Sequence, residues 1–346
     1  MIKVRAERLI PLVQQIFSRA GCHSPEDSQI ARRLVESNLV GHDSHGVIRV
    51  AYYIDWLKKD MVRANQKVQT VFETDTLAVL DGQRGFGQSV GEQALEIAIA
   101  KAKKSALSIL ALRNTAHLGR IGDWPQMACD AGLCSLFFVN TSGFGLLVAP
   151  WGGIDRRLSA NPVAAGVPVP GGTDIIYDIS TSSIAEGKLK VAFNKGVDVP
   201  PGCIIDHDGN PTNDPKTFYG KPPGAILPFG GYKGYGLGII AEMFAGALTG
   251  SGCSDPSAPY LINGMFALLI DPERIPNDIG FGHEVERFIA FVKQSRKATP
   301  DSEILMPGEI ETRTKQQRLA EGIELDDITW KSLCDTAQTL GVTISV

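Results

Sequence analysis

The spacing of hydrophobic and polar positions predicts that both ends of the chain are helical. Residues 1–60 carry apolar side chains at helical intervals, and Ser24-Pro25-Glu26-Asp27 is typical of a helix start, with Ser24 as the N-cap. Near the other end, 284–295 and 312–321 show charged helical patterns. The sequence contains no internal repeat and no low-complexity linker, so we expect helices from the two ends to pack together.

The middle of the chain combines short apolar runs with helical repeats. This pattern predicts an α/β fold with two interleaved units: a helical unit of residues 1–75 and 285–346, and a mixed α/β unit of residues 76–284. The predicted strands are 68–72, 77–81, 108–112, 134–139, 163–169, 175–179 and 265–270. The predicted helices between them are 89–104, 122–131 and 236–248.

The composition is that of an ordinary globular protein. Its 346 residues are 43% hydrophobic and 21% charged, with a net charge of −4 and no basic stripe of the kind that binds nucleic acid. No run of about 18 apolar residues suggests a membrane span, and Met1 leads directly into a mixed-charge pattern without a signal segment. We therefore expect a cytoplasmic protein that binds a small molecule. Six scattered cysteines without a CxxC pair favour reduced thiols.

Segment 41–49 (GHDSHGVIR) contains the first candidate chemistry. His45 and Arg49 are four residues apart, so on a helix they share a face, which also collects Tyr52 and Trp56. A proton donor beside a carboxylate clamp suits a 2-keto or 2-hydroxy acid. The alternative is an ordinary amphipathic helix that happens to carry one His and one Arg. The opposite side forms an apolar stripe of Val47, Val50, Ala51, Ile54 and Leu57.

A second histidine follows a predicted strand. His117 comes after strand 108–112, in a loop where Gly119 and Gly122 allow close approach of the backbone. Reactive groups of α/β proteins gather at strand ends. The alternative is a strand-end histidine that is satisfied by a backbone hydrogen bond, and this segment alone leaves both interpretations open.

Two later segments could hold an anion. Segment 177–183 (YDISTSS) offers one acid and four hydroxyls to phosphate and ribose oxygens, or else provides the N-cap of a helix before Ala185. In segment 230–238 (GGYKGYGLG), glycines surround Lys233 just before a predicted helix. The GxGxxA letters of 236–241 have no preceding strand and no following acid of a βαβ unit, so we reject a Rossmann assignment.

Two lookalike metal motifs lack the necessary ligands. Segment 206–210 (DHDGN) starts like a calcium loop, but Pro211 stands where an EF-hand needs Gly, and Asp208-Gly209 is a better hairpin turn. His42 and His45 are three residues apart, yet no motif supplies the remaining ligands. The sequence therefore predicts no metal site.

In order along the chain, these segments resemble the type-2 malate/L-lactate dehydrogenase family, which includes ureidoglycolate dehydrogenase, diketogulonate reductase, sulfolactate dehydrogenase and Δ1-piperideine-2-carboxylate reductase. The resemblance covers nearly the whole chain. Segments 80–82, 86–88 and 194–206 are similar to the bacterial hydroxycarboxylate dehydrogenase B type. The family motifs stand at 41–46, 117–122, 149–153, 161–162, 178–182, 233–235 and 305–309.

The resemblance implies a non-Rossmann α/β fold of the L-sulfolactate dehydrogenase type, with a mixed central sheet and an interleaved helical subdomain. It implies an NAD(P)-dependent 2-hydroxyacid dehydrogenase that forms a homodimer with its active site in a cleft. In that interpretation the helical unit serves substrate binding and dimerisation, and the mixed α/β unit binds the cofactor. The similarity to the hydroxycarboxylate branch favours NAD over NADP.

The resemblance also assigns residues. The acid/base is His45 or His117, and we favour His117, with His45 as its partner near the nicotinamide and the substrate. From the chemistry of segment 41–49 we expect Arg49 to bind the substrate carboxylate and Ser44 to hydrogen-bond it or to orient His45, and we add Thr141 to the substrate contacts. The cofactor contacts carried over by motif are His45, Thr141, Asp178, Ile179, Ser180, Lys233, Gly234, Pro307, Gly308 and Glu309.

The substrate stays open at this point. Segment 140–145 departs from some relatives, and Phe144 places a bulky apolar group where the substrate is expected. A 2-keto or 2-hydroxy acid is the first choice, and the cyclic imine acid of the piperideine-carboxylate branch is the alternative. The interpretation from a different functional class is a module that binds a nucleotide or a small acid without catalysis.

Overall fold

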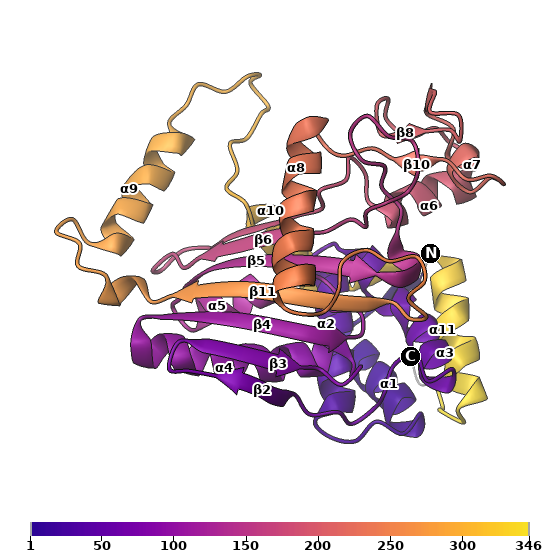
Figure 1. Ribbon diagram of the computed structural model, residues 1–346, viewed down its shortest axis with the longest axis horizontal. Helices are drawn as coiled ribbons and strands as arrows, with labels where there is room; N and C mark the ends of the chain where they lie inside the picture. Colours follow the sequence, from indigo (N-terminus) through magenta and orange to yellow (C-terminus); the bar gives the residue numbers. More distant parts are fainter. Residues whose placement is uncertain (1, 345–346) are drawn as a thin grey trace.

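The computed structural model of the protein describes residues 2–344 and is built on a seven-stranded sheet (Figure 1). The strand order is β2-β3-β4-β11-β5-β6-β7; β3 and β4 are parallel, and the other neighbours are antiparallel. This mixed sheet confirms the predicted fold class. The strands span Gln69–Glu73 (β2), Leu77–Asp81 (β3), Leu107–Thr115 (β4), Cys134–Ser142 (β5), Val163–Val167 (β6), Ile175–Ile179 (β7) and Ile262–Ile270 (β11).

Alternating side chains give the sheet two apolar faces. Phe137 and Val139 of β5 pack with α4 and α5 on one face, whereas Phe138 and Phe266 pack with α8 and its continuation on the other. Figure 1 shows α8 crossing the sheet on the side opposite α4 and α5. These segments are α4 (Gly87–Ser105), α5 (Asp123–Asp130), α8 (Tyr232–Ala241) and the π-helix η4 (Glu242–Leu248).

The β3–α4–β4 crossover brings two loops to one edge of the sheet. Because β3 and β4 are parallel, the loop leading into α4 and the loop after β4 leave at the same end. Backbone bonds join them: Ala116 N–H donates to the Gly85 carbonyl at 3.0 Å, and Arg84 N–H donates to the Asn114 carbonyl at 2.8 Å. His117 lies in this second loop, next to the start of α4.

Helices from the two ends of the chain form one layer, as predicted, except that the helix at Phe281–Lys293 does not join it. Apolar side chains of α1, α2, α3 and α11 share a core cluster that includes Phe17, Leu34 and Leu333, and Figure 1 shows these helices together at one end of the sheet. The boundaries of the two predicted units stay a prediction. The layer comprises α1 (Ala6–Arg19), α2 (Glu26–Leu39), α3 (Val50–Lys58), α10 (Glu309–Glu321) and α11 (Asp327–Thr339).

Two details of this layer differ from the prediction. The short strands β1 (Ile2–Val4) and β12 (Ile323–Leu325) pair antiparallel, although residues 1–60 were expected to be helical throughout. Pro25 occupies the N-cap position of α2, and no side chain caps this helix, so the prediction of Ser24 as its N-cap is wrong. Three residues are too few for a hydrophobic alternation, which is why the pattern did not show β1.

A small lobe of short elements lies beside the sheet and packs on its own apolar cluster. Its strands β8 and β9 are joined by the predicted hairpin turn, in which Gly209 has a φ of +86°. The elements are α6 (Glu186–Lys195), β8 (Ile204–Ile205), β9 (Pro211–Thr212), α7 (Pro215–Phe218) and β10 (Ala225–Ile226).

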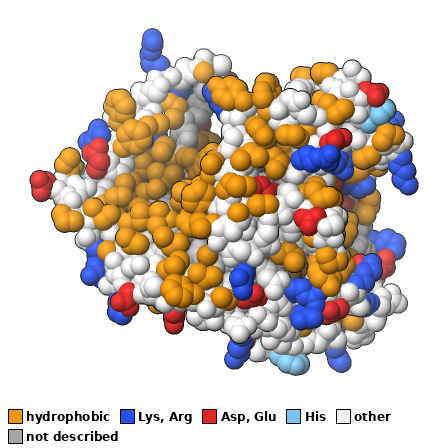
Figure 2. Space-filling model, in the orientation of Figure 1, with side chains coloured by type: hydrophobic (Ala, Val, Ile, Leu, Met, Phe, Trp, Pro, Cys, Tyr) orange, Lys and Arg blue, Asp and Glu red, His pale blue; other side chains and the backbone are white. Residues whose placement is uncertain are grey.

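Helix α9 (Phe281–Lys293) stands away from the body of the protein (Figure 1). None of its residues is buried, and Phe288 and Phe291 are 51% and 64% exposed. Figure 2 shows hydrophobic side chains gathered on the same side of the molecule, around a hollow. Within residues 2–344, every helix is too short or too polar to span a membrane.

Candidate active site

The helix expected over His45 and Arg49 is interrupted. Asp43–His45 and Val47–Arg49 form two separate 3-10 turns, and Gly46 between them has a ψ of −148°. The prediction that both side chains share one helical face is therefore wrong. They are neighbours for another reason: Arg49 Nε donates to the Ser44 carbonyl at 2.7 Å, and Ser44 Oγ lies 2.9 Å from His45 Nδ1.

Asn38 of α2 shapes this break in the chain. Its side chain is 1% exposed; Oδ1 accepts the Val47 N–H at 2.8 Å, and Nδ2 donates to Asp43 Oδ1 at 2.7 Å. A Cβ at Gly46 would collide with the Asn38 amide, so this close approach requires glycine. The amide thus holds the chain on both sides of His45.

His117 lies after β4 and is directed toward α3. Its Nδ1 is 2.7 Å from the Tyr53 hydroxyl, and Gln88 Nε2 donates to the same hydroxyl at 2.9 Å. The His117 ring stacks on the His45 ring, with 5.6 Å between centroids and 20° between planes. The residue of α3 at this site is Tyr53, which is 1% exposed, and not the predicted Tyr52, which is 54% exposed.

Asn263 of β11 fixes the backbone next to His117. Its Oδ1 accepts the Leu118 N–H at 2.9 Å, and its Nδ2 donates to Thr141 Oγ1 at 2.8 Å. Thr141 of β5 stands opposite Asn263 in the strand register. One buried amide therefore joins the His117 loop to the strand that carries Thr141.

Burial and one cation lower the pKa of both imidazoles. Desolvation, followed by the field of the Arg49 guanidinium, lowers the pKa of His117 to about 3. The same two causes, in the same order, hold the pKa of His45 well below its ordinary range, and His117 adds to them. Both rings are therefore neutral near pH 7.

Asp178 and the Pro307–Glu309 segment meet at the opposite end of the site. Ile176 N–H donates to the Pro307 carbonyl at 3.1 Å, and Gly308, with a φ of +97°, allows the chain to turn against β7. Asp178 Oδ2 accepts the Gly122 N–H at 2.7 Å, which links this segment to the loop that carries His117. Burial raises the pKa of Asp178, against the lowering effect of a nearby arginine.

The serine and threonine run after β7 is not a helix cap. Helix α6 begins at Glu186, and its N-cap Ala185 receives no side-chain bond, so the N-cap alternative for 180–183 is wrong. Instead, Ser180 Oγ donates to the Ala160 carbonyl at 3.1 Å and lies 2.5 Å from Ser182 Oγ. The hydroxyls form a compact polar cluster at the end of the strand.

Lys233 lies inside a helix and not before it. Helix α8 begins at Tyr232, four residues earlier than predicted, which puts Lys233 in the first turn. Its exposed side chain forms no ion pair with the residues that the structure describes. Gly234 is buried, and a Cβ there would collide with the Phe229 carbonyl oxygen. Close packing of α8 therefore leaves the ammonium group directed to solvent.

Phe144 and Trp56 form an aromatic wall next to the histidines. Their ring centroids are 6.0 Å apart, and Trp56 in turn lies 5.5 Å from Tyr53. Phe144 is 53% exposed and stands in the segment that departs from some relatives. The structure thus brings Phe144 to the expected substrate side.

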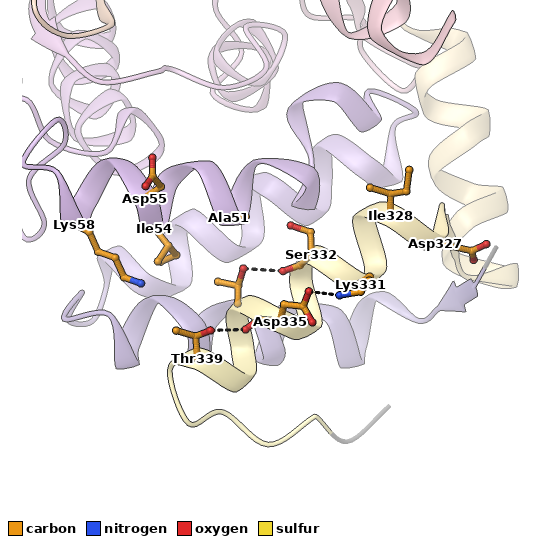
Figure 3. Close-up of a pocket in the computed structure, with 11 residues that line it drawn as sticks. Ala51, Ile54, Asp55, Lys58, Asp327, Ile328, Lys331, Ser332, Asp335 and Thr339 are labelled. Atoms are coloured by element: carbon orange, nitrogen blue, oxygen red, sulfur yellow. Dashed lines mark hydrogen bonds and ion pairs between the residues drawn. The ribbon is translucent and has the colours of Figure 1, made fainter. Parts of the chain in front are cut away.

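A groove of about 580 Å³ lies between α3 and α11, on another face of α3 from Tyr53 (Figure 3). Figure 3 shows Ile54 and Lys58 directed toward α11, where Lys331 and Asp335 form an ion pair of 2.6 Å. None of the predicted site residues lines it. We therefore place the candidate site at the histidines, where the titratable groups converge, and not in this larger groove.

The two histidines of the possible metal motif have other partners. His42 Nε2 lies 3.5 Å from Glu311 Oε1 of α10, whereas His45 Nδ1 contacts Ser44. Over residues 2–344, no group of three or more His, Cys, Asp or Glu side chains is arranged to hold a metal ion.

Four residues of this site were not found from the sequence: Asn38, Tyr53, Gln88 and Asn263. Asn38 and Asn263 gave a weak signal, because each is a polar residue on an otherwise apolar face. Tyr53 gave none, because a tyrosine near a helix start is ordinary. Gln88 stands in segment 86–88, which carries part of the resemblance, but no role was assigned to it. The crossover of α4 brings Gln88 to His117, and the packing of the helical layer brings Tyr53 there.

Comparison with known proteins agrees with this geometry. The fold is that of non-Rossmann dehydrogenases: the L-sulfolactate dehydrogenase of Methanocaldococcus jannaschii superposes with a TM-score of 0.88 at 32% identity, over 99% of this chain and 98% of that one. The Δ1-piperideine-2-carboxylate reductase of Pseudomonas syringae gives a TM-score of 0.83 at 27% identity, over 97% and 100%.

Sequence comparison is more specific. Hydroxycarboxylate dehydrogenase B of Escherichia coli is 35% identical over 342 residues, which cover 97% of this chain and 94% of that protein. The malate/L-lactate dehydrogenase family profile matches residues 4–334. The chain therefore belongs to the malate/L-lactate dehydrogenase family, which confirms the resemblance seen in its motifs.

Proposed function

We propose that the protein is an NAD(P)-dependent oxidoreductase that transfers a hydride reversibly between a nicotinamide and a 2-keto or 2-hydroxy carboxylic acid. The observation that carries the proposal is the pair of neutral, stacked histidines with Arg49 beside them. A dehydrogenase of this kind needs one group to exchange a proton and one to bind a carboxylate. Family membership and the printed names of the relatives support the same class of substrate.

The residues at the Asp178 end fit a dinucleotide. The Asp178 carboxylate can accept from ribose hydroxyls, and the Lys233 ammonium at the start of α8 can balance the charge of phosphate oxygens. The hydroxyls of 180–183 already donate to backbone carbonyls, so they contact a cofactor as acceptors. Arg120 Nε is buried nearby without a hydrogen-bond partner among the described residues, so a donor is available. We assign the cofactor contacts to His45, Thr141, Asp178, Ile179, Ser180, Lys233, Gly234, Pro307, Gly308 and Glu309.

The nicotinamide, when bound, supplies or accepts the hydride. His117 exchanges the proton with the substrate oxygen through Nε2, because Tyr53 already occupies Nδ1. Ser44 contacts His45 Nδ1 and so orients the ring that stacks on His117. Among the residues that touch the substrate we also place Thr141, which is fixed by Asn263.

Arg49 binds the substrate carboxylate and also tunes the histidines. Its Nε is used by the Ser44 carbonyl, which leaves both terminal amino groups for a two-point contact with a carboxylate. In the free protein the guanidinium lowers the pKa of His117 and His45. A bound carboxylate offsets that field, so substrate binding raises the pKa of both rings and allows His117 to hold the proton it must deliver.

The test is oxidation of NADH and NADPH, followed by absorbance, against a panel of 2-keto acids. Turnover with keto acids is the expected result. If no 2-keto acid and no 2-hydroxy acid reacts in either direction while both cofactors bind, the proposal is wrong and a binding role without catalysis takes its place.

Reduction of a cyclic imine acid is the second candidate. It is favoured by the structural similarity to Δ1-piperideine-2-carboxylate reductase and by the aromatic wall of Phe144 and Trp56, against which an apolar ring can pack. The same assay with Δ1-piperideine-2-carboxylate separates the candidates, because the preferred acceptor has the higher kcat/KM.

We further propose NAD as the preferred dinucleotide. The support is the acidic Asp178, since a carboxylate at the ribose disfavours a 2′-phosphate. The assay above compares kcat/KM for NADH and NADPH, and a preference for NADPH would contradict the assignment.

We also infer a homodimer. Helix α9 exposes Phe288 and Phe291 away from the body, and a helix with an apolar face and no buried residue requires a partner surface. Sedimentation is expected to give a dimer that weakens when both residues are replaced by serine. The helical unit as the dimerisation part, and a cytoplasmic location, stay predictions.

A further inference from the structure

We propose that Gln88 and Tyr53 are positioning residues that decide which ring nitrogen of His117 carries the proton, through a hydrogen-bond chain that can run in either direction. The inference rests on the proposed role of His117 in proton exchange. Neither residue was assigned from the motifs.

The chain is buried and continuous. Gln88 is 2% exposed and Tyr53 is 1% exposed; the Gln88 amide contacts the Tyr53 hydroxyl at 2.9 Å, and that hydroxyl contacts His117 Nδ1 at 2.7 Å. Gln88 Oε1 has no hydrogen-bond partner among the described residues. The Tyr53 hydroxyl is therefore the one hydrogen-bond partner of this amide among the described residues, and no second partner fixes which amide atom faces it.

In the first arrangement, which is the one in the structure, the Gln88 amino group donates to the Tyr53 oxygen. The single hydroxyl proton of Tyr53 is then free to donate to His117 Nδ1. The neutral ring consequently carries its own proton on Nε2, the atom that faces away from Tyr53. In this state His117 cannot accept a proton from a 2-hydroxy acid.

In the second arrangement the Gln88 amide has rotated by half a turn. Oε1 accepts the Tyr53 proton, and the Tyr53 oxygen accepts the proton of His117 Nδ1. Nε2 is now free to take a proton from the substrate hydroxyl and, once protonated, to return it to the substrate oxygen in the reverse direction. The proton that leaves Nε2 is the proton that the substrate gains, so the exchange is balanced. In each arrangement one Gln88 amide atom contacts Tyr53 and the other has no partner among the described residues.

Glutamine is the side chain that supports both arrangements, because a donor and an acceptor stand on one rotatable group. A carboxylate only accepts, and a thioether cannot donate and accepts only weakly. Gly119, with a φ of +77°, makes room for this amide, since a Cβ there would lie 2.9 Å from Gln88 Nε2.

Among the residues that the structure describes, only the Tyr53 hydroxyl forms a hydrogen bond with His117 Nδ1. The charged and titratable groups that face His117 are Arg49 and His45 from the 3-10 turns and Tyr53 from α3. Arg49 opposes a positive charge on the ring until a carboxylate binds to it. Substrate binding and rotation of the amide therefore favour the same protonated state of His117.

The decisive experiment is nitrogen NMR of the full-length protein with ¹⁵N-labelled histidine, without substrate. The chain has six histidines, and His117→Gln identifies the signal of His117. Wild type is expected to show the Nε2–H tautomer near pH 7. Gln88→Glu is expected to convert it to Nδ1–H and to raise its pKa, whereas Tyr53→Phe is expected to give a mixture. An identical tautomer in all three proteins would overturn the proposal.

Kinetics provide the second readout. Gln88→Met should lower kcat/KM about 10- to 100-fold, the range usual for residues that orient a functional ligand, with cofactor binding retained. Gln88→Glu should shift the pH profile of kcat/KM to higher pH in both directions of the reaction. The matched control is Gln93→Met, because Gln93 lies on the same helix and bonds to Gln66 and Ser89, away from the site.

The two proposals can fail separately. If the tautomer responds to Gln88 but no keto or hydroxy acid reacts, the hydrogen-bond chain stands and the proposed reaction is wrong. If the enzyme turns over but Gln88→Glu leaves both the tautomer and the pH profile unchanged, the reaction stands and the role of the chain is wrong.

Discussion

The two histidines of the site are held in different ways. The ring of His45 has its partner in the adjacent residue, Ser44, and a single amide from α2 holds the turn around it. The ring of His117 contacts Tyr53 of α3, the Tyr53 hydroxyl is in turn held by Gln88 of α4, and the backbone next to His117 is fixed by β11. One histidine is positioned locally, and the other by the assembled sheet and helices.

This difference indicates a division of labour. A group that exchanges a proton has to keep its geometry as its charge changes, and contacts from several elements provide that rigidity. A group that supports a ring and contacts a cofactor tolerates more movement. The contrast therefore favours His117 as the acid/base, in agreement with its assignment from the motifs.

Replacing each histidine should separate the two roles most strongly. His117→Ala should lower kcat by about 10²- to 10⁴-fold, because general acid–base catalysis contributes that range, whereas His45→Ala should have a smaller effect. Steady-state kinetics measure both, and NADH binding by fluorescence is the control. Equal losses in the two variants would contradict the division of labour.

Replacing Arg49 should act on the substrate and not on the cofactor. Arg49→Ala should lower kcat/KM about 10- to 100-fold, since a charged hydrogen bond is worth roughly 1.5–3 kcal/mol, mainly through a higher KM. Arg49→Lys keeps the charge but not the two-point contact and should lie between Ala and wild type. A change confined to the KM of the cofactor would move Arg49 out of the substrate site.

Replacing the two buried asparagines compares the structural support of the His45 turn with that of the His117 loop. Asn38→Leu and Asn263→Leu should each lower the free energy of unfolding by about 1–3 kcal/mol, because each leaves buried backbone donors without partners. Urea denaturation measures this loss. Asn38→Leu should then impair the His45 turn, whereas Asn263→Leu should disturb both the His117 loop and Thr141 and cost more kcat. If Asn38→Leu lowers kcat more than Asn263→Leu does, the turnover depends more on the support of His45 than on that of His117.

Stability against acid should report the buried imidazoles. The folded-state pKa of His117 is about 3, well below its ordinary value near 6.5. The unfolded chain therefore binds more protons, and the contribution to stability that is present above about pH 6.5 is lost as the pH falls toward the folded pKa. Urea titrations at about pH 7.5 and about pH 5 measure the free energy of unfolding. Its loss between the two pH values should be larger in wild type than in His117→Asn. Equal losses in the two proteins would show that the His117 imidazole binds its proton at the same pH in the folded protein as in the unfolded chain.

The smallest effect is expected from removing the contact between the Ser44 hydroxyl and His45. Ser44→Ala removes the hydroxyl from His45 Nδ1 but keeps the Ser44 carbonyl that binds Arg49. We expect about a 2- to 5-fold loss of kcat/KM, equal to the net value of one hydrogen bond of about 0.5–1 kcal/mol. A loss as large as that of His45→Ala would show that His45 depends on this contact alone.

Much of this architecture could be predicted from the sequence. The strands of the central sheet and the helices 89–104 and 122–131 were placed close to their observed bounds, because hydrophobic periodicity depends on local sequence. The position of His117 just after a strand was predicted for the same reason. The break at Gly46 could not be predicted. It depends on Asn38, which reaches the turn from the preceding helix. His45 and Arg49 therefore have helical spacing in the sequence, although the backbone between them is not a continuous helix.

The start of α8 was missed for a related reason. Glycines on both sides of Lys233 favour a loop by propensity, yet Gly234 and Gly238 are the positions where α8 packs closely on its neighbours. Tertiary packing outweighed the intrinsic preference of the residues. Likewise, Tyr53 reaches His117 through the packing of α3, and Gln88 reaches Tyr53 through the α4 crossover; no local sequence pattern shows either contact.

The position of β11 has a consequence for how the chain is made. β11 is the last strand of the central sheet in the sequence, yet it lies in the middle, where it pairs with β4 and β5, for example Ile270 with Leu107 and with Cys134. While the chain is being synthesised, the edges of β4 and β5 that pair with β11 therefore stay unpaired until residues 262–270 leave the ribosome. Such long-range pairing slows folding and exposes strand edges to aggregation. Successful production of the protein therefore depends on a segment that arrives late.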